Sequence, residues 1–313
     1  MSATMSITIG TRGSPLARAQ AEEVRARLIA AHPALAAEDA IRTEIIMTSG
    51  DRFTDRPLAD IGGKGLFTKE IEDALLDGRI DIAVHSMKDM PTVLPDGLVI
   101  DCILPREDPR DVLIGEGITG VGALPKGARV GTASLRRQAQ LLHCRPDLDI
   151  TMLRGNVQTR LSKVAAGEVD ATLLAYAGLR RLSAYDERWA VLGVDELLPA
   201  VAQGAIGIEC RAGDESVAAA LAPLNCATSA SRVAAERALL AELDGSCRTP
   251  IAALAEIDEA GMLHLRALIA TPDGKTCHAT ERRGPAGDAV ALGCDAGAEL
   301  KTRGGADFFA HLP

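Results

Sequence analysis

The chain has 313 residues, a formal net charge of −9 and a hydrophobic content of 47%. A chain of this size forms two or three compact domains. The negative charge and the few aromatic residues (one Trp, two Tyr and four Phe) argue against a nucleic-acid partner, and no apolar stretch approaches the roughly 20 residues that span a bilayer. Because residues 1–10 also lack an export signal, we expect a cytoplasmic protein without a membrane partner.

The seven cysteines are scattered and form no Cys-x-x-Cys pair. This pattern argues against both a disulfide framework and a zinc site. We therefore expect reduced thiols and no metal.

Short β-type runs alternate with helical stripes from the start of the chain, which predicts an α/β fold. The expected elements are strands at 6–9, 42–47 and 80–84, and helices from Pro15 and from about Thr68. Ser14 followed by Pro15 predicts a helix start, because Ser caps free N–H groups and Pro needs no bond there. The expected core stripe of this helix is Leu16, Val24, Leu28 and Ala31.

A second α/β series follows from about residue 127. Its expected elements are strands at 128–130, 149–152 and 170–174, and helices from Ser134 and after Asn156. The two series open alike, since residues 10–16 and 131–136 both run through Gly-Thr and a Ser cap into a helix. If the likeness is real, each lobe directs a helix N-terminus at a shared, anion-binding cleft.

Proline-rich segments at 104–109 and 198–204 predict two crossovers between the lobes, with 205–210 returning to the first. Beyond residue 223 we expect a helix near 229–243, with Val233, Leu240 and Leu243 on one stripe, and then strands at 251–256 and 262–270. The predicted domains are 1–104 with 205–222, then 105–204, and finally a small α+β domain at 223–313.

Two pairs of arginines, Arg136 with Arg137 and Arg154 with Arg160, stand out in this acidic chain. Arginine stays charged and its planar fork fits a carboxylate or phosphate at two points. Clustered arginines repel one another unless an anion relieves them. The sequence therefore predicts an anion site in the second lobe.

Polar residues Ser86, Lys88 and Asp89 follow a predicted buried strand. In open α/β sheets ligands bind at this edge, although a solvated loop would have the same composition. Cys247 follows a predicted helix end, where the helix dipole and Arg248 act on the thiol in opposite directions, so the residues alone do not mark it as a nucleophile. Residues 50–65 lack an apolar period and are expected to form a mobile lid, not a nucleotide loop.

Together these segments resemble the porphobilinogen deaminase family. The matching motifs lie in the family's order at 11–16, 62–67, 84–89, 106–111, 131–137, 153–160 and 202–205, and at Cys247 with Pro250. The resemblance implies two lobes like periplasmic binding proteins, joined by a double crossover, plus a small C-terminal domain. It also implies a monomeric enzyme that joins four porphobilinogen molecules head to tail on a dipyrromethane primer, with loss of ammonia, and releases linear hydroxymethylbilane by hydrolysis.

The resemblance also assigns residues. Asp89 takes the place of the catalytic aspartate and Cys247 that of the cysteine that holds the primer by a thioether. The positions that bind the primer's carboxylates correspond to Arg12, Ser14, Ser86, Lys88, Thr132, Ser134, Arg136, Arg137, Arg154, Arg160, Arg181 and Gln203. The primer loop departs from the family pattern, with Ser246 where a second Gly is common.

These residues suit the chemistry, since each porphobilinogen carries an acetate and a propionate. Arginines bind such carboxylates, and a carboxylate at Asp89 would stabilise the cation that forms as ammonia leaves. Two alternatives remain: an anion receptor without chemistry and a phosphate-handling transferase. The third domain and Cys247 argue against the first, and the lack of a nucleotide loop or metal carboxylates argues against the second.

Overall fold

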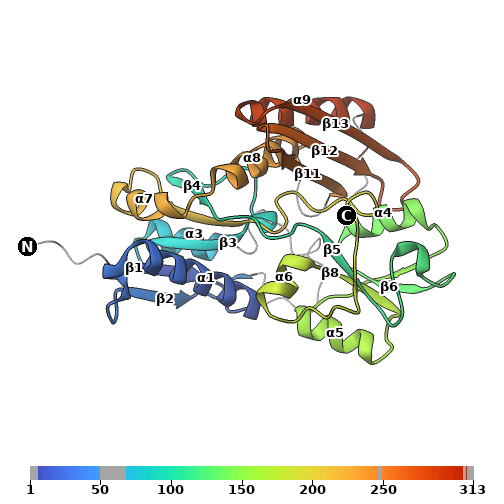
Figure 1. The fold of residues 1–313 in the computed structure, drawn as a ribbon, viewed down its shortest axis with the longest axis horizontal. Coiled ribbons are helices and arrows are strands. Elements are labelled where there is room, and N and C mark those ends of the chain that lie inside the picture. The colour runs from blue at the N-terminus through green and yellow to red at the C-terminus, as the bar shows by residue number, and fades with distance from the viewer. Residues whose placement is uncertain (1–5, 50–67, 246–248, 306–307, 309–313) are drawn as a thin grey trace, which may run out of the picture. The chain divides into compact units, whose positions relative to one another are not determined.

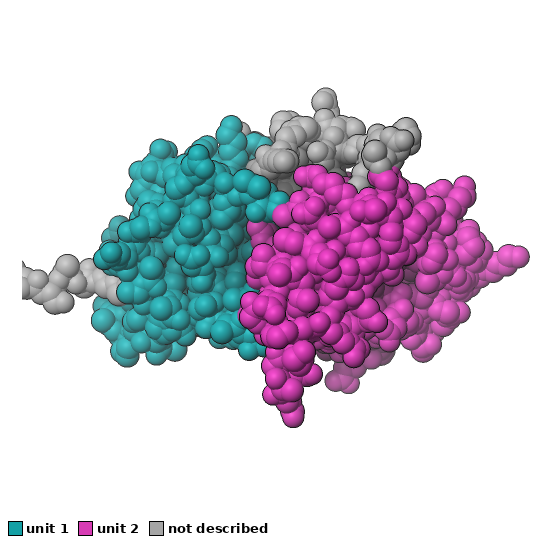
Figure 2. All heavy atoms as spheres, turned by 90° about the horizontal axis from the view of Figure 1, so that it is seen from above, with its two compact units in different colours: residues 1–106, 205–230 teal, residues 107–204, 231–313 magenta. Residues whose placement is uncertain are grey.

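The computed structural model describes residues 6–49, 68–245, 249–305 and 308. The chain divides into two compact units (Figure 2, teal and magenta). Unit 1 consists of residues 1–106 and 205–230, and unit 2 of residues 107–204 and 231–313. The predicted boundaries of three domains stay a prediction, as does the shared cleft. The predicted lid at 50–65 and Cys247 lie outside the described residues.

Unit 1 is built on a five-stranded sheet with the order β2-β1-β3-β10-β4 (Figure 1). Its strands are β1 (Ile7–Thr11), β2 (Ile41–Ile45), β3 (Ile82–Ser86), β4 (Leu98–Ile103) and β10 (Ile206–Arg211). Strand β1 runs parallel to β2 and β3, whereas β10 runs antiparallel to β3 and β4. The position of β10 confirms the predicted return of the chain after the second crossover.

The helices of unit 1 are α1 (Pro15–Ala31), α3 (Lys69–Leu76) and α7 (Glu215–Leu221). Helix α1 starts where predicted, because the Ser14 hydroxyl accepts a 3.2 Å bond from the backbone N–H of Ala17. Val24 and Leu28 are buried as expected. Ala31 is exposed, contrary to the prediction, because it is the last helical residue and the chain turns away there.

The main sheet of unit 2 has the order β7-β6-β8-β5-β9. Its strands are β5 (Asp111–Ile114), β6 (Arg129–Gly131), β7 (Asp149–Thr151), β8 (Ala171–Ala175) and β9 (Ala190–Val191). Strand β6 is parallel to β7 and β8, and β5 is antiparallel to β8 and β9. The two five-stranded sheets therefore share strand order and directions, although the fourth strand of the order comes last along the chain in unit 1 (β10) and first in unit 2 (β5). The shared order agrees with the likeness of the two opening motifs.

Three helices accompany this sheet: α4 (Leu135–Cys144), α5 (Val157–Ala165) and α6 (Tyr176–Arg181). Ser134 and Asn156 cap α4 and α5, as predicted, by accepting bonds from backbone N–H groups three residues ahead. Strand β5 was not predicted. All four of its residues are buried, so they do not alternate between apolar and polar side chains. A run of four residues is also too short to be distinguished from a loop by its hydrophobic pattern.

The C-terminal part of unit 2 contains an antiparallel sheet with the order β11-β12-β13. Its elements are β11 (Ile251–Ile257), β12 (Met262–Ala270), β13 (Cys277–Pro285) and α9 (Ala289–Gly304), which packs on β12 and β13 (Figure 1). The long helix α8 (Ala227–Glu242) precedes them near its predicted bounds. The α/β class, with two larger sheets and a smaller one, is confirmed. No helix within the described ranges is long and apolar enough to cross a membrane.

Gly204 provides a test of the second crossover. Its φ is +89°, and a Cβ there would overlap the carbonyl oxygen of Glu107. We expect Gly204→Ala to lower the free energy of unfolding by more than about 3 kcal/mol, because backbone strain adds to the overlap. Gly167 also has a positive φ but open space around it, so Gly167→Ala should cost only about 1 kcal/mol. Equal losses in urea unfolding would contradict this account.

Candidate functional site

The predicted residues of unit 1 meet at one edge of its sheet. Arg12 and Ser14 follow β1, and Ser86, Lys88 and Asp89 end or follow β3. Because β1 and β3 are parallel neighbours, with Gly10 opposite Ala83, these carboxyl ends lie at the same edge. Asp89 closes the 3-10 turn Met87–Asp89 and is exposed to solvent.

Gln20 holds Ser86 from the side of α1. Its amide Nε2 donates to the Ser86 hydroxyl at 2.8 Å, and that hydroxyl lies 3.1 Å from the Gln20 Oε1. Gln20 is only 4% exposed. The sequence analysis missed this residue, although a polar side chain one turn ahead of Val24 on an apolar stripe was a usable signal.

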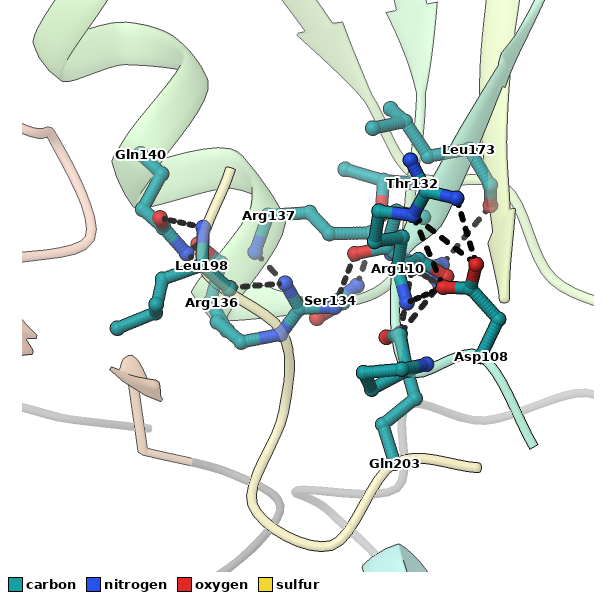
Figure 3. A network of polar contacts seen from close by, with 12 residues as sticks. Asp108, Arg110, Thr132, Ser134, Arg136, Arg137, Gln140, Leu173, Leu198 and Gln203 are labelled. Atoms are coloured by element: carbon teal, nitrogen blue, oxygen red, sulfur yellow. Dashed lines mark hydrogen bonds and ion pairs between the residues drawn. The ribbon is translucent and has the colours of Figure 1, made fainter. Parts of the chain in front are cut away.

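In unit 2 the turn between β6 and α4 is fixed by its own hydroxyl groups (Figure 3). The backbone N–H of Ser134 donates to Thr132 Oγ1 at 3.1 Å, and Ser134 Oγ accepts from the backbone N–H of Arg137 at 3.4 Å. Both hydroxyls therefore act in the turn and the helix cap. Their predicted contact with a ligand stays a prediction.

Arg136 and Arg137 are gathered by a single buried carboxylate, Asp111, at the start of β5. Arg136 Nη2 donates to one Asp111 oxygen at 2.7 Å, and Arg137 Nη2 donates to the other at 2.7 Å. Their Nη1 groups donate to the carbonyl oxygens of Leu198 and Leu173, both at 2.8 Å. Figure 3 shows both arginines directed into this network. Asp111 is fully buried, and the arginines are 5% and 6% exposed.

Gln203 belongs to the same network. Its Nε2 donates to an Asp111 oxygen at 2.9 Å and to the carbonyl oxygen of Pro109 at 2.7 Å. Arg181 also makes a backbone contact, since its Nη2 donates to the carbonyl oxygen of Gly204 at 3.1 Å. The structure thus uses both residues to hold the second crossover, and ligand binding by them stays a prediction.

The electrostatics of this cluster leave one positive charge uncompensated. Burial alone would raise the pKa of the Asp111 carboxyl, but Arg136 and Arg137 outweigh burial and hold that pKa below its usual range. Two guanidinium groups then share one carboxylate. Each also keeps a buried Nε–H without an acceptor among the described residues. A buried excess charge is costly, so the cluster favours an anion nearby.

Arg154 and Arg160 add further positive charge beside this cluster. Burial, together with repulsion by Arg137 and Arg154, lowers the pKa of Arg160 to about 10. Arg160 Nε donates to the carbonyl oxygen of Gly155 at 2.9 Å, and within the described ranges Arg160 forms no ion pair with a carboxylate. The structure thus brings these arginines within electrostatic reach of one another, as an anion site requires.

Comparison with known proteins decides the family. The family model described as "Porphobilinogen deaminase, dipyromethane cofactor binding domain" matches residues 7–219. The model described as "Porphobilinogen deaminase, C-terminal domain" matches residues 230–302. The chain belongs to the porphobilinogen deaminase family. The chloroplastic porphobilinogen deaminase of Oryza sativa subsp. japonica is 56% identical over 308 residues, covering 98% of this chain and 86% of the relative. That of Paracoccus denitrificans is 58% identical, covering 97% of this chain and 96% of the relative.

Solved structures of binding proteins are also similar in part. A probable amino-acid ABC transporter extracellular-binding protein from Bacillus subtilis has a TM-score of 0.42 at 13% identity, covering 70% of this chain and 91% of its own. The periplasmic aliphatic sulphonate binding protein of Escherichia coli has a TM-score of 0.40 at 17% identity, covering 76% and 70%. Scores this low carry no argument, so the fold class rests on the two sheets themselves.

Porphobilinogen deaminases carry a dipyrromethane cofactor, and the described residues fit such a group. A ligand with several carboxylates would relieve the repulsion at Arg160 and compensate the excess charge of the Asp111 cluster. The enzyme class implied by the resemblance is thereby confirmed, since both the family and the cofactor are shown. Cys247, the predicted point of attachment, lies outside the described residues.

Asp111 is the residue of this network that the sequence analysis missed. We expect Asp111→Asn to lower the free energy of unfolding by about 3–5 kcal/mol, because it leaves two buried guanidinium groups without a countercharge. Since the pKa of Asp111 is lowered in the folded protein, its contribution is present at neutral pH and fades as the solution becomes strongly acidic. At neutral pH, Asp111→Asn should therefore show the full loss in the free energy of unfolding.

The control is Asp170→Asn, which removes a carboxylate of the same unit whose 3.0 Å ion pair with Arg129 is exposed. Exposed pairs contribute little, so its unfolding curve should nearly match the parent protein. Guanidinium unfolding followed by circular dichroism measures both. If the two variants lost similar stability, Asp111 would not be the organising charge.

Proposed function

We propose that this protein joins four porphobilinogen molecules head to tail, with loss of ammonia, on a dipyrromethane primer held by Cys247, and releases the linear hydroxymethylbilane by hydrolysis. Membership of the porphobilinogen deaminase family supports the reaction. The observation that carries it is the crowding of Arg137, Arg154 and Arg160 without a described carboxylate at Arg160. That arrangement suits a ligand with many carboxylate groups. Because the family consists of enzymes, the alternative of an anion receptor without chemistry is less favoured.

The arginines bind and orient the acidic arms. Each porphobilinogen adds an acetate and a propionate, so negative charge accumulates as the chain grows. A hydrogen bond to a charged group contributes about 1.5–3 kcal/mol net. The acidity of the whole protein does not oppose this binding, because beyond a Debye length of about 8 Å surface charges are screened. In unit 1, Arg12 and Lys88 supply further cations at the sheet edge that carries Asp89.

Asp89 acts on the charge that develops during the reaction. Loss of ammonia leaves a positive charge on the substrate's pyrrole and its methylene carbon. A fixed carboxylate beside that carbon lowers the barrier by electrostatic stabilisation. The substrate amine is already protonated near neutral pH, so little help from a general acid is needed. An exposed position at the end of a strand suits Asp89 for contact with a substrate.

The primer, when bound, supplies the pyrrole carbon to which the next unit is joined. Cys247 would hold it by a thioether, which resists hydrolysis and so keeps the primer in place when product leaves. We also propose a monomer in the cytoplasm that acts without a nucleic-acid or membrane partner. The relative from Paracoccus denitrificans is named simply porphobilinogen deaminase, whereas the relative from Oryza sativa is named as chloroplastic.

Substitution of Asp89 tests the electrostatic role. We expect Asp89→Asn to reduce kcat by about 10²–10³-fold, because the amide cannot balance the developing charge. Asp89→Glu should retain part of the activity, and Asp96→Asn, at an exposed site of the same unit, should keep all of it. Ammonia release from porphobilinogen measures the rate. Full activity of Asp89→Asn would remove Asp89 from the mechanism.

Attachment of the primer is tested by intact mass. The purified protein should weigh more than its polypeptide by one dipyrromethane unit and give a pyrrole colour reaction. Cys247→Ala should have the bare polypeptide mass and give no colour, whereas Cys144→Ala, at an exposed free thiol, should keep the added mass. If Cys247→Ala still carried the pyrrole adduct, another residue would hold the primer.

A further inference from the structure

Three ionisable side chains of unit 1 lie in the apolar layer between helix α3 and the sheet. Ile71, Ala74 and Leu75 of α3 pack in this layer against Ala83 of β3. His85 is two residues beyond Ala83 and therefore faces the same layer. The neighbour of β3 in the sheet is β10, which places Glu209 opposite Ala83.

The flanking residues confirm these directions. Val84 of β3, and Ile208 and Cys210 of β10, belong to the core cluster on the other side of the sheet. Alternation along both strands then directs His85 and Glu209 toward α3. Glu72 belongs to the buried face of α3, beside Ile71.

All three side chains are almost completely buried. Exposure is 5% for His85, 0% for Glu209 and 6% for Glu72. His85 Nε2 and Glu209 Oε2 are 2.8 Å apart, which makes one hydrogen bond between them.

Each glutamate nevertheless has one carboxylate oxygen without a hydrogen-bond donor among the described residues. Glu72 Oε1 and Glu209 Oε1 are buried and have no hydrogen-bond partner among the described residues. Two ionised carboxylates in an apolar layer would leave both oxygens unsatisfied and would repel each other. A single proton shared between the two carboxyl groups would remove both penalties.

The pKa of Glu72 agrees with this reading. Burial raises it most, and Glu209 and Asp73 raise it further, whereas the nearby Thr68 hydroxyl and the charge of His85 lower it. The net effect is a raised pKa. Asp73 is exposed on the same helix, so Glu209 and His85 are the ionisable groups that face Glu72 inside the layer.

We propose that Glu72 is a carboxylic acid in the folded protein, and that its O–H donates to Glu209, which also accepts from His85. One retained proton then ties α3 to β3 and β10. Ser86 directly follows His85, and the backbone N–H of Met87 donates to the carbonyl oxygen of Ala205 at 3.0 Å, just before β10. The cluster therefore fixes the strand ends from which the turn Met87–Asp89 begins.

Glu72 and Glu209 are thus positioning residues for Asp89, a role that rests on the proposed function. The protonated state of Glu72 does not depend on that function. Because folding raises the pKa of Glu72, the folded protein binds this proton more tightly than the unfolded chain does. The stabilisation is complete at acidic pH and is lost as the pH rises through the folded pKa.

Infrared spectroscopy of the intact protein tests the retained proton directly. In the parent protein we expect a carboxylic-acid C=O stretch that persists above about pH 5, where an exposed glutamate is ionised, and that disappears on unfolding. The band should be absent from Glu72→Gln and present in Asp73→Asn, its neighbour on the exposed side of α3. Absence of the band from the folded parent protein would overturn the proposal without any variant.

Thermal unfolding from about pH 5 to about pH 8 supplies a second readout. Glutamine cannot ionise but can still donate to Glu209. The Tm of Glu72→Gln relative to the parent protein should therefore rise as the pH increases, whereas Asp73→Asn should follow the parent protein in parallel. A constant difference between Glu72→Gln and the parent protein across this range would contradict a titrating Glu72.

Activity separates positioning from stability. Glu72→Leu removes the donor, and we expect a loss in kcat of about tenfold with KM little changed, because a small misplacement of Asp89 acts on the chemical step. Glu72→Gln should recover most of that kcat. If both variants lost kcat equally while folded, the positioning role would fall. If instead the parent protein released no ammonia from porphobilinogen, the proposed function would fail while the infrared and Tm results would still stand.

Discussion

A single buried carboxylate, Asp111, imposes the strongest constraint on unit 2. It sits at the start of β5 with both oxygens accepting from arginine, and it draws α4, the end of β8 and the second crossover toward one point. Burying an acid there is tolerable only because two guanidinium groups surround it. The same arrangement leaves the cluster with a net positive charge. The proposed binding of acidic ligands and the architecture of the lobe would thus have one physical origin.

The two sheets share their strand order and directions but surround their buried carboxylates differently. In each, the antiparallel strand bears a fully buried carboxylate: Glu209 on β10 and Asp111 on β5. Asp111 is surrounded by cations and stays ionised, whereas Glu209 has one imidazole and, by our inference, a protonated Glu72 beside it. The sheet edge of unit 1 carries Asp89 together with Arg12 and Lys88, whereas unit 2 gathers arginines around Asp111. The same strand order thus holds two different polar clusters because the buried partners differ.

Local signals in the sequence predicted the starts of elements well. Ser14, Ser134 and Asn156 each cap a helix where expected, since capping depends only on neighbouring backbone groups. The arginine spacings predicted an anion site, and the family resemblance is confirmed. Pairings distant in sequence could not be predicted in this way. In the sequence, Asp111 resembled the end of a charged loop. Only the fold shows that Arg136 and Arg137, which follow it by 25 and 26 residues, donate to its carboxylate.

Glu72 and Glu209 were missed for a related reason. A glutamate in an amphipathic helix or in a strand ordinarily faces solvent, so composition predicts exposure. Burial of both depends on which strand becomes the neighbour of β3, and that neighbour comes from the far side of the second crossover. Gly204 is similar, since the need for its backbone conformation arises from the close approach of Glu107.

The two sheets differ in connectivity, and this difference bears on the order in which the chain can fold. Strand β10 completes the first sheet between β3 and β4, yet it is synthesised only after the whole of residues 107–204. During synthesis, the edges of β3 and β4 that later pair with β10 stay unpaired until β10 has been made. Strands β5 to β9 come from one contiguous stretch of chain and can assemble earlier. Strand β3, which leads into the turn Met87–Asp89, can therefore gain its neighbour β10 only after the strands of the second lobe have been synthesised.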